Sequence, residues 1–362
     1  MRRGLANHLA ALGLAVTTVA LVAAPSGAAV GDITTFDDPA GNVLVPSGIT
    51  SGPDGALWFT STNNDRIGRI TTEGQITTFD DPGGNVDEPV GITSGPDGAL
   101  WFTSAGNDRI GRITTEGAIT TFADPGGNVS NPVGITSGPD GALWFTSNDN
   151  DRIGRITTEG EITTFVIPDG VVDDQPVGIT AGPDGAVWFS GFFSGRIGRV
   201  TPVGDFTMFD LPLPLQSPSG ITLGPDGALW FPSTLTSNFG RITTDGTISV
   251  FLTTGDVDAP TGITAGPDGA LWFTSGLNQR VGRLTTDGTV TTYEDPNGNI
   301  EGPGAITTGA DCALWFANEG SDNIGRVDSG VVPGTVVFPV GGCANPPVPV
   351  PVPVPLTPTF TG

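Results

Sequence analysis

One sequence string recurs seven times along the chain and limits its possible folds more than any other feature. The string reads Gly-Pro-Asp-Gly-Ala-Leu-Trp-Phe, or a near variant of it. Every tryptophan of the protein occupies the same slot in this string, at positions 58, 101, 144, 188, 230, 272 and 315. Successive tryptophans are therefore 42 to 44 residues apart. A period of about 40 to 45 residues with four short strand-like runs is typical of the blades of a β-propeller.

Each repeat contains four runs rich in β-branched and aromatic residues, separated by Gly, Pro, Asn and Asp. In the second repeat these runs predict strands at residues 91–94, 99–104, 109–114 and 119–122. We therefore predict an all-β protein, a seven-bladed β-propeller of four-stranded antiparallel blades. A single blade cannot bury its two faces, so the Trp, Phe and Ile side chains are expected to pack between blades. Stacking of a ligand on the tryptophans is the alternative.

Glycine and proline are abundant, with 56 and 32 residues among 362, a level that approaches low-complexity composition. The repeat places most of them at the same turns in each blade, where glycine and proline favour the backbone conformations of a tight turn. The exception is the run from Pro346 to Pro355, in which proline alternates with other residues. We expect residues 344–362 to form a Pro-rich disordered tail with polyproline II character.

The two ends of the repeat region indicate how the ring closes. Residues 33–36 resemble the outer strands, such as residues 76–79, and are predicted to complete the last blade. Residues 335–338 compete for that place. Cys312 and Cys343 are predicted to form a disulfide in an exported chain. Cys312 lies in a turn at one end of the last blade, so the bridge favours residues 33–36 as the closing strand, with residues 331–343 as a tether.

The N-terminus has the pattern of a secretory signal peptide. Arg2 and Arg3 precede an apolar run over residues 9–24, and small residues follow up to Ala29. We predict a signal peptide over residues 1–29, a propeller over residues 31–343 and a secreted protein. A membrane anchor is the alternative, but the apolar run is short.

The charge balance narrows the possible partners. The chain has 38 acidic and 14 basic residues and a formal net charge of −24, so nucleic acid and anionic membranes are excluded as partners. We expect no membrane insertion, a monomer, and a small molecule or an extracellular protein as partner. All twelve arginines after the first 29 residues fall in an Arg-Ile-Gly-Arg segment or its variants. Pairing of these arginines with nearby acids is favoured over an anion-binding groove, and the intervening glycine is interpreted as allowing close approach of blades.

The loops after the second and fourth strands of each blade are predicted to share one face of the disk. In the first blade these loops are residues 62–65 and 80–88, and they are rich in Asp and Asn. Such oxygen-bearing side chains suit Mg²⁺ or Ca²⁺, the only cofactors that we expect. Turn formation is the competing explanation of the same residues.

The repeat as a whole resembles one known family. The form G-I-T-x-G-P-D-G-A-L-W-F-T, followed by R-I-G-R-I-T-T-E-G-x-I-T-T-F, is similar to the virginiamycin B lyase (streptogramin B lyase) family, over residues 31–327. The resemblance implies a seven-bladed propeller and a magnesium-dependent carbon–oxygen lyase that linearises a cyclic depsipeptide without water. It also implies a histidine base in the last blade, a substrate-contacting histidine in the blade before, and acidic metal ligands.

This chain departs from the family pattern at the positions that carry chemistry. The base slot is Gly304 and the substrate-histidine slot is Thr261, while the only histidine is His8, inside the predicted signal peptide. At one position where the resemblance implies an acidic metal ligand, this chain has Gly302, with Glu301 adjacent to it. The acidic residue expected after the last Trp-Phe pair is present as Glu319. The matching segments of other blades carry no carboxylate but a serine, namely Ser61, Ser104, Ser147, Ser233 or Ser275.

These departures leave two hypotheses about function. Glu301 and Glu319 are the predicted metal ligands, and Glu319 is the candidate catalytic base because Tyr293 fills an outer-strand core slot. The first hypothesis is a secreted binding or scaffold module that has lost the lyase histidine. The second is a lyase, or another lactone-acting enzyme, that uses Glu319 as base or metal ligand.

Overall fold

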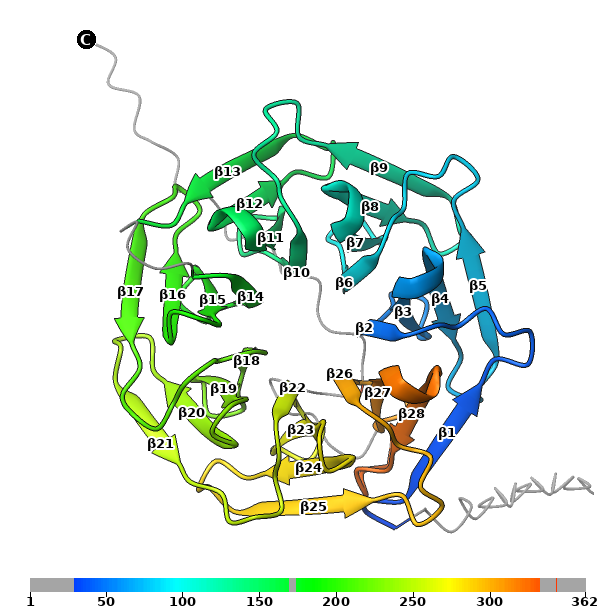
Figure 1. Cartoon of the computed structure of the whole chain (residues 1–362), viewed down its shortest axis with the longest axis vertical. Helices are drawn as coiled ribbons and strands as arrows, with labels where there is room; N and C mark the ends of the chain where they lie inside the picture. The colour runs from blue at the N-terminus through cyan, green and yellow to red at the C-terminus, as the bar shows by residue number, and fades with distance from the viewer. Residues whose placement is uncertain (1–28, 169–173, 333–342, 344–362) are drawn as a thin grey trace, which may run out of the picture.

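Each repeat of the sequence forms one sheet of four antiparallel strands, and the seven sheets are arranged as blades around a ring (Figure 1). This computed structural model describes residues 29–168, 174–332 and 343. The second blade consists of β6 (Pro89–Ser94), β7 (Leu100–Ser104), β8 (Arg109–Ile113) and β9 (Ile119–Ala123). The strands predicted for this blade are confirmed, with ends that differ by one or two residues.

The other blades repeat this pattern, with the inner strand first and the outer strand last. Their strands are, in chain order, β2 (Pro46–Ser51), β3 (Leu57–Ser61), β4 (Arg66–Ile70), β5 (Ile76–Asp80); β10 (Pro132–Ser137), β11 (Leu143–Ser147), β12 (Arg152–Ile156), β13 (Ile162–Val166); β14 (Pro176–Ala181), β15 (Val187–Gly191), β16 (Arg196–Val200), β17 (Phe206–Asp210); β18 (Thr222–Leu223), β19 (Leu229–Ser233), β20 (Asn238–Ile242), β21 (Ile248–Phe251); β22 (Pro260–Ala265), β23 (Leu271–Ser275), β24 (Arg280–Leu284), β25 (Val290–Glu294); and β26 (Pro303–Thr308), β27 (Leu314–Asn318), β28 (Asn323–Val327). Short 3₁₀ turns follow the second strand in four blades: η1 (Thr62–Asn64), η2 (Ala105–Asn107), η3 (Asn148–Asn150) and η4 (Glu319–Ser321).

The ring closes through the N-terminal strand. β1 (Ile33–Asp37) pairs antiparallel with β28 and becomes the outer strand of the last blade (Figure 1). The closing strand predicted from the sequence is thus confirmed. The competing segment, residues 335–338, lies outside the described residues, as do residues 1–28 of the predicted signal peptide and the predicted tail at residues 344–362.

The hydrophobic core lies between neighbouring blades. All seven tryptophans and their following phenylalanines are fully buried, and seven clusters each combine side chains of two adjacent blades. Each tryptophan stacks on the aromatic residue of its own outer strand, for example Trp58 on Phe79 at 5.4 Å and Trp272 on Tyr293 at 5.5 Å. The predicted packing role of the tryptophans is confirmed. A ligand cannot stack on rings that have no exposed surface.

The second arginine of each Arg-Ile-Gly-Arg segment is paired within its own blade. In all seven blades it donates to the aspartate of the Gly-Pro-Asp-Gly turn, or to its equivalent Asp311, over 2.5 to 2.8 Å. The other carboxylate oxygen of that aspartate accepts from the indole N–H of the buried tryptophan, as Asp140 does from Trp144 at 2.9 Å. The predicted pairing with acids is confirmed for these seven arginines, whereas Arg109 and Arg152, first arginines of their segments, donate to Thr121 and Thr164.

The glycine between the two arginines has a different role from the one expected. A Cβ at Gly68 would lie 2.0 Å from Cζ of Phe59, its partner in the same blade. This glycine therefore makes room for a phenylalanine ring and does not bring blades together. Close approach of blades depends on the glycine of the inner strand, since a Cβ at Gly134 would lie 2.2 Å from the carbonyl oxygen of Val177 in the next blade.

A hydroxyl group links these inner strands around the ring. Thr60 accepts from the N–H of Gly48 at 2.8 Å and donates to the carbonyl oxygen of Val90 in the next blade at 2.7 Å. The same bridge is made by Thr103, Thr146, Ser190 and Thr274. The last blade has Ala305 in place of the inner glycine and Ala317 in place of the hydroxyl residue. Its junction with the first blade is therefore built differently from these five.

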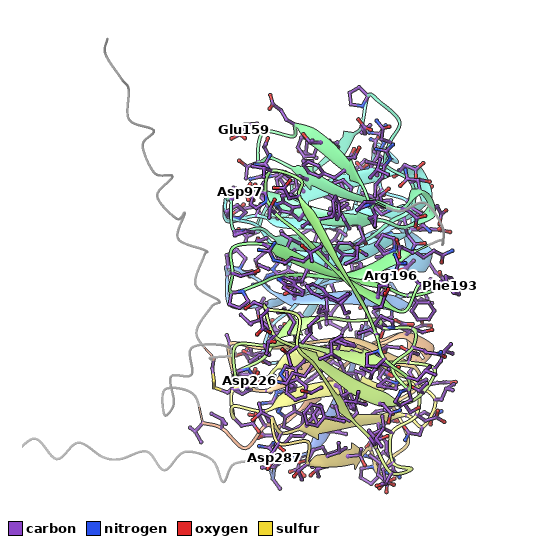
Figure 2. The ribbon with its side chains drawn as sticks, turned by 90° about the vertical axis from the view of Figure 1, so that its left-hand side faces the viewer. Asp97, Glu159, Phe193, Arg196, Asp226 and Asp287 are labelled. Atoms are coloured by element: carbon purple, nitrogen blue, oxygen red, sulfur yellow. A yellow bond between two sulfur atoms is a disulfide. The ribbon has the colours of Figure 1, made fainter. Side chains whose placement is uncertain are left out.

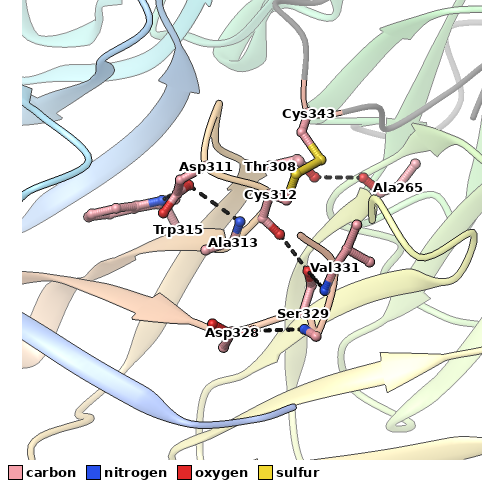
Figure 3. Close-up of a disulfide and its surroundings, with 11 residues drawn as sticks. Ala265, Thr308, Asp311, Cys312, Ala313, Trp315, Asp328, Ser329, Val331 and Cys343 are labelled. Carbon is pink, nitrogen blue, oxygen red and sulfur yellow. Dashed lines mark hydrogen bonds between the residues drawn. A yellow bond between two sulfur atoms is a disulfide. The ribbon is translucent and has the colours of Figure 1, made fainter. Parts of the chain in front are cut away.

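The predicted disulfide is present. Cys312 lies in the turn between β26 and β27 and is bonded to Cys343, with Cα atoms 4.7 Å apart (Figure 3). Ser329, two residues after β28, donates from its hydroxyl to the carbonyl oxygen of Cys312. Both contacts attach the segment that follows the last strand to the end of the last blade that carries the tight turns. Among the described residues, no helix has the length and apolar character needed to cross a membrane.

Candidate functional site

The two faces of the disk carry different connections between strands. The turn face carries the tight turns, including those of Asp97 and Asp226, while Phe193 lies on the opposite side (Figure 2). That opposite side, the loop face, carries the loops after the second and fourth strands of each blade.

A cavity of about 570 Å³ lies at the centre of the ring, where the inner strands begin. All seven blades contribute to its wall, which is mainly backbone and small or apolar side chains, such as Gly91, Val133 and Ala305. Because the inner strands begin at the loop face, the cavity is the mouth of the central channel on that face. Among the described residues that line it, Glu319 alone carries a charge.

The carboxylate of Glu319 lies directly beside Gly304, the position that the family resemblance predicts as the base slot. Gly304 has no side chain, and a Cβ at this position would lie 2.2 Å from Oε1 of Glu319. Glu319 is half-buried, and within the described part of the chain its side chain has no hydrogen-bond or ion-pair partner. Burial alone raises the pKa of Glu319 above its ordinary value. The site thus holds a desolvated, unpaired carboxylate where the family pattern expects an imidazole.

The strand register refines the position of Glu319 in the repeat. Pro303 pairs with Asn318, as Pro46 pairs with Ser61 in the first blade. Asn318 therefore fills the serine slot, and it accepts from the N–H of Glu301 at 2.8 Å. Glu319 comes one residue later, where the other blades have Thr62, Ala105, Asn148, Phe192, Thr234 and Gly276. The conclusion that no other blade carries an acid in this slot still holds.

The two positions that the resemblance predicts as histidine slots, Thr261 and Gly304, lie close together and are connected by hydrogen bonds. Thr261 and Gly304 both line the cavity, each directly after the proline that opens its inner strand. The hydroxyl of Thr274 lies 3.2 Å from that of Thr261 and donates to the carbonyl oxygen of Gly304 at 2.6 Å. Thr261, Gly304 and Glu319 therefore form one edge of the channel mouth.

Glu301 and Glu319, the predicted metal ligands, are not brought together as a metal-binding site in this structure. Glu301 is exposed, does not line the cavity, and makes no contribution to the raised pKa of Glu319. Within the described ranges, no three His, Cys, Asp or Glu side chains are grouped as metal ligands would be. Mg²⁺ requires about six oxygen ligands in near-octahedral geometry, and these residues do not fit that requirement. Binding of Mg²⁺ or Ca²⁺ stays a prediction from the sequence, and no chemical step below depends on it.

Many acidic loop residues have structural partners. Asp81 accepts from the backbone N–H groups of Gly83 and Asn85, at 2.9 and 2.7 Å, and so forms its own turn. Asp65 accepts from the N–H of Glu88 at 2.9 Å and connects two blades. These carboxylates are occupied by the backbone, which favours the turn explanation of the Asp- and Asn-rich loops.

Sequence reasoning missed the apolar part of the site. Leu277 lines the cavity, yet its side chain is 74% exposed on the loop face. It lies in a loop with no strand periodicity, so no pattern of alternation identifies it. Comparison of the fifth residue after each tryptophan would have found it, because Phe193 and Leu235 occupy the same position.

Comparisons with known proteins agree with the fold and the repeat. The model of the virginiamycin B lyase family matches residues 26–171 and 170–337. A solved streptogramin B lyase is 34% identical, with 82% of this chain and 97% of that chain covered and a TM-score of 0.75. A catalytically inactive histidine-to-alanine variant of virginiamycin B lyase from Staphylococcus aureus, solved with quinupristin, is 36% identical, with coverage of 82% and 99% and a TM-score of 0.75.

A more distant match concerns the fold alone. Hydrazine synthase from Kuenenia stuttgartiensis is 16% identical, with 82% of this chain and 97% of that chain covered and a TM-score of 0.64. No curated protein sequence matches the chain.

Proposed function

The chain belongs to the virginiamycin B lyase family, and we propose that it is an exported member that binds a small molecule at the channel mouth without the family's histidine-dependent reaction. One observation carries this proposal: the carboxylate of Glu319 lies in the space that a side chain at position 304 would fill. A ligand seated in the mouth meets an unpaired carboxylate and a mainly apolar wall.

The histidine content supports the loss of the family reaction. The related S. aureus lyase becomes catalytically inactive when one histidine is replaced by alanine. In this chain the only histidine is His8, and the two expected histidine positions are Gly304 and Thr261. A base must lie within hydrogen-bond reach of the proton that it removes, and a residue of the predicted signal peptide does not meet this requirement. Export is supported by the N-terminal pattern and by the disulfide between Cys312 and Cys343.

The test uses quinupristin, the compound present with the S. aureus variant. The purified chain is incubated with quinupristin and Mg²⁺, and the linear product is followed by mass spectrometry. We expect no linearisation by the natural chain. The active S. aureus lyase serves as the positive control, and turnover by the natural chain at a comparable rate would refute the proposal.

A second candidate function is supported by the raised pKa of Glu319. A carboxylate in an apolar pocket can act as a general base near neutral pH. In a lyase reaction Glu319 would take a proton from carbon, the carbon–oxygen bond of the lactone would break, and a double bond and a free carboxylate would form. The same assay tests this function with Glu319→Gln, which keeps the size of the side chain but cannot accept that proton. Activity that is present in the natural chain and lost in Glu319→Gln would establish it.

A further inference from the structure

Three consecutive blades present large apolar side chains on the loop face, and one of these side chains, that of Leu277, lines the channel mouth. Phe193, Leu235 and Leu277 are each the fifth residue after the tryptophan of their blade, and they are 62%, 72% and 74% exposed. We call these three residues the apolar arc. Two further exposed leucines lie in the loops that enter the second and third of these blades, Leu213 at 78% and Leu252 at 68%.

The apolar arc is confined to one part of the ring. The same position in the other four blades is occupied by Asn63, Gly106, Asp149 and Gly320, all small or polar. Packing between blades does not require the arc, because its side chains point to solvent and the core is made by other residues. Clustered exposed apolar groups of this size generally mark a binding surface.

The arc meets the cavity that contains Glu319 at Leu277. Leu277 belongs to both, since it lines the cavity and is exposed at its rim. A ligand that lies across the arc therefore reaches a mouth whose charged lining residue, among those described, is the unpaired Glu319. The strongly negative net charge of the chain further favours a cation over an anion at this site.

We infer that the ligand is a cationic amphiphile, whose apolar body packs on Phe193, Leu235 and Leu277 while its ammonium group reaches Glu319. This inference rests on the proposed binding function and adds the chemical class of the ligand. The apolar body supplies burial of hydrophobic surface, and the ammonium group gives the desolvated carboxylate the partner that the protein does not provide.

The test uses two fluorescent probes that differ only in charge. Dansylcadaverine has an apolar naphthalene ring and a primary ammonium group, and its N-acetyl derivative is neutral. Binding to the purified chain at pH 7 is followed by the change in dansyl emission. We expect dansylcadaverine to bind about tenfold more tightly than the acetylated probe, the discrimination that corresponds to about 1.4 kcal/mol for one charge-assisted contact.

Three variants separate the two parts of the site. Glu319→Gln should abolish the preference for the cationic probe and leave binding of the acetylated probe unchanged. The triple variant Phe193→Ser, Leu235→Ser and Leu277→Ser should weaken both probes about tenfold or more, because the buried apolar area is lost, and should keep the preference. Val203→Ser, which changes an 80% exposed valine in a tight turn on the turn face, is the matched control and should bind as the natural chain does.

The outcomes distinguish the two proposals. If the triple variant, with an unchanged melting temperature, binds both probes as the natural chain does, the inference about the ligand class is wrong while the proposed site at Glu319 stands. If Glu319→Gln keeps the preference for the cation, the role of Glu319 in the proposed function is wrong. No saturable binding of either probe, or an arc that is covered by a second copy in a dimer measured by light scattering, would overturn the inference.

Discussion

Replacement of Asp140 by alanine tests the interaction that each blade repeats. Asp140 accepts from the indole N–H of Trp144 at 2.9 Å through one oxygen and from Nε of Arg155 at 2.6 Å through the other. Trp144 is fully buried, so its indole N–H would lose its partner without access to water. An unsatisfied buried donor costs about 1 to 3 kcal/mol. The side chains of Arg155 and Asp140 are 25% and 17% exposed, so solvent screens the ion pair and we assign at most about 1 kcal/mol to it.

We therefore expect Asp140→Ala to lower the free energy of unfolding by about 2 to 4 kcal/mol. Asp140→Asn keeps an oxygen for the indole N–H, but its amide nitrogen cannot accept from Arg155, so the variant loses the ion pair alone and should cost about 1 kcal/mol. Urea unfolding followed by tryptophan fluorescence measures both, and an unchanged m-value shows that the same structure unfolds. Glu161→Gln is the control, because Glu161 is exposed and its side chain has no interaction among the described residues.

The pH dependence gives a second check of the same pair. Burial raises the pKa of Asp140, but the hydrogen bonds from Trp144 and Arg155 outweigh it, and the folded pKa lies below 3.8. The stabilisation is therefore present above pH 3.8 and is lost as the pH falls through the folded pKa. The difference between the natural chain and Asp140→Ala should shrink below about pH 4. A cost of Asp140→Ala below about 0.5 kcal/mol at pH 7, or equal costs of the alanine and asparagine variants, would refute this reasoning.

Three further predictions address the ring, its closure and the site. Gly134→Ala should destabilise the protein by about 1 to 3 kcal/mol, because the new Cβ would lie 2.2 Å from the carbonyl oxygen of Val177; Ala305→Gly, at the junction that already tolerates a Cβ, is the control and should cost less than about 1 kcal/mol in the same urea titration. Cys312→Ser should lower stability by about 3 to 4 kcal/mol, since the bridge closes a loop of 31 residues, and the natural chain with reductant should match the variant; a variant as stable as the oxidised chain would contradict the prediction. Glu319→Gln should raise the melting temperature at pH 7 but not at pH 4. Burial raises the folded pKa of Glu319, so this carboxyl contributes stability below its unfolded pKa of about 4.5, and that contribution is lost as the pH rises through the folded pKa. A melting temperature that is unchanged at both pH values would show that burial of Glu319 costs no stability.

The fold can be predicted from the sequence because the same strand and turn residues recur in seven repeats. Period, turn residues and the match of residues 33–36 to the outer strands determine blade number and closure without any tertiary information. The role of the glycines was predicted wrongly for a physical reason. Each blade has one glycine in its inner strand and one in Arg-Ile-Gly-Arg, and only the strand register shows that Gly68 faces Phe59 of its own blade while Gly134 faces the next blade.

The site is predicted only in part, because some of its contacts are visible only in the three-dimensional structure. Glu319 could be found because an acid after the Trp-Phe pair breaks the repeat, although the register moves it from the serine slot to the following position. Its contact with Gly304 depends on the path of a loop and could not be read from spacing. The apolar arc was missed because Phe193, Leu235 and Leu277 lie in loops, where exposure rather than periodicity identifies a residue.

Three of the positions at which the last blade differs from the repeat lie at or near the channel mouth. Elsewhere, many buried or half-buried carboxylates have partners, such as the arginines of the turn face and the backbone N–H groups that donate to loop aspartates. In the last blade, Ala305 and Ala317 replace the residues that join most neighbouring inner strands, and Glu319 is placed half-buried beside them without a partner. Propeller packing accounts for the two alanines, since Ala305 packs against the cluster between the last and first blades and Ala317 is fully buried, but it does not account for Glu319. A desolvated charge that lowers stability at neutral pH is retained most readily when a ligand supplies the missing partner. Among the described residues, the surface beside Glu319 that such a ligand would contact is formed by the channel mouth, which Leu277 connects to the apolar arc.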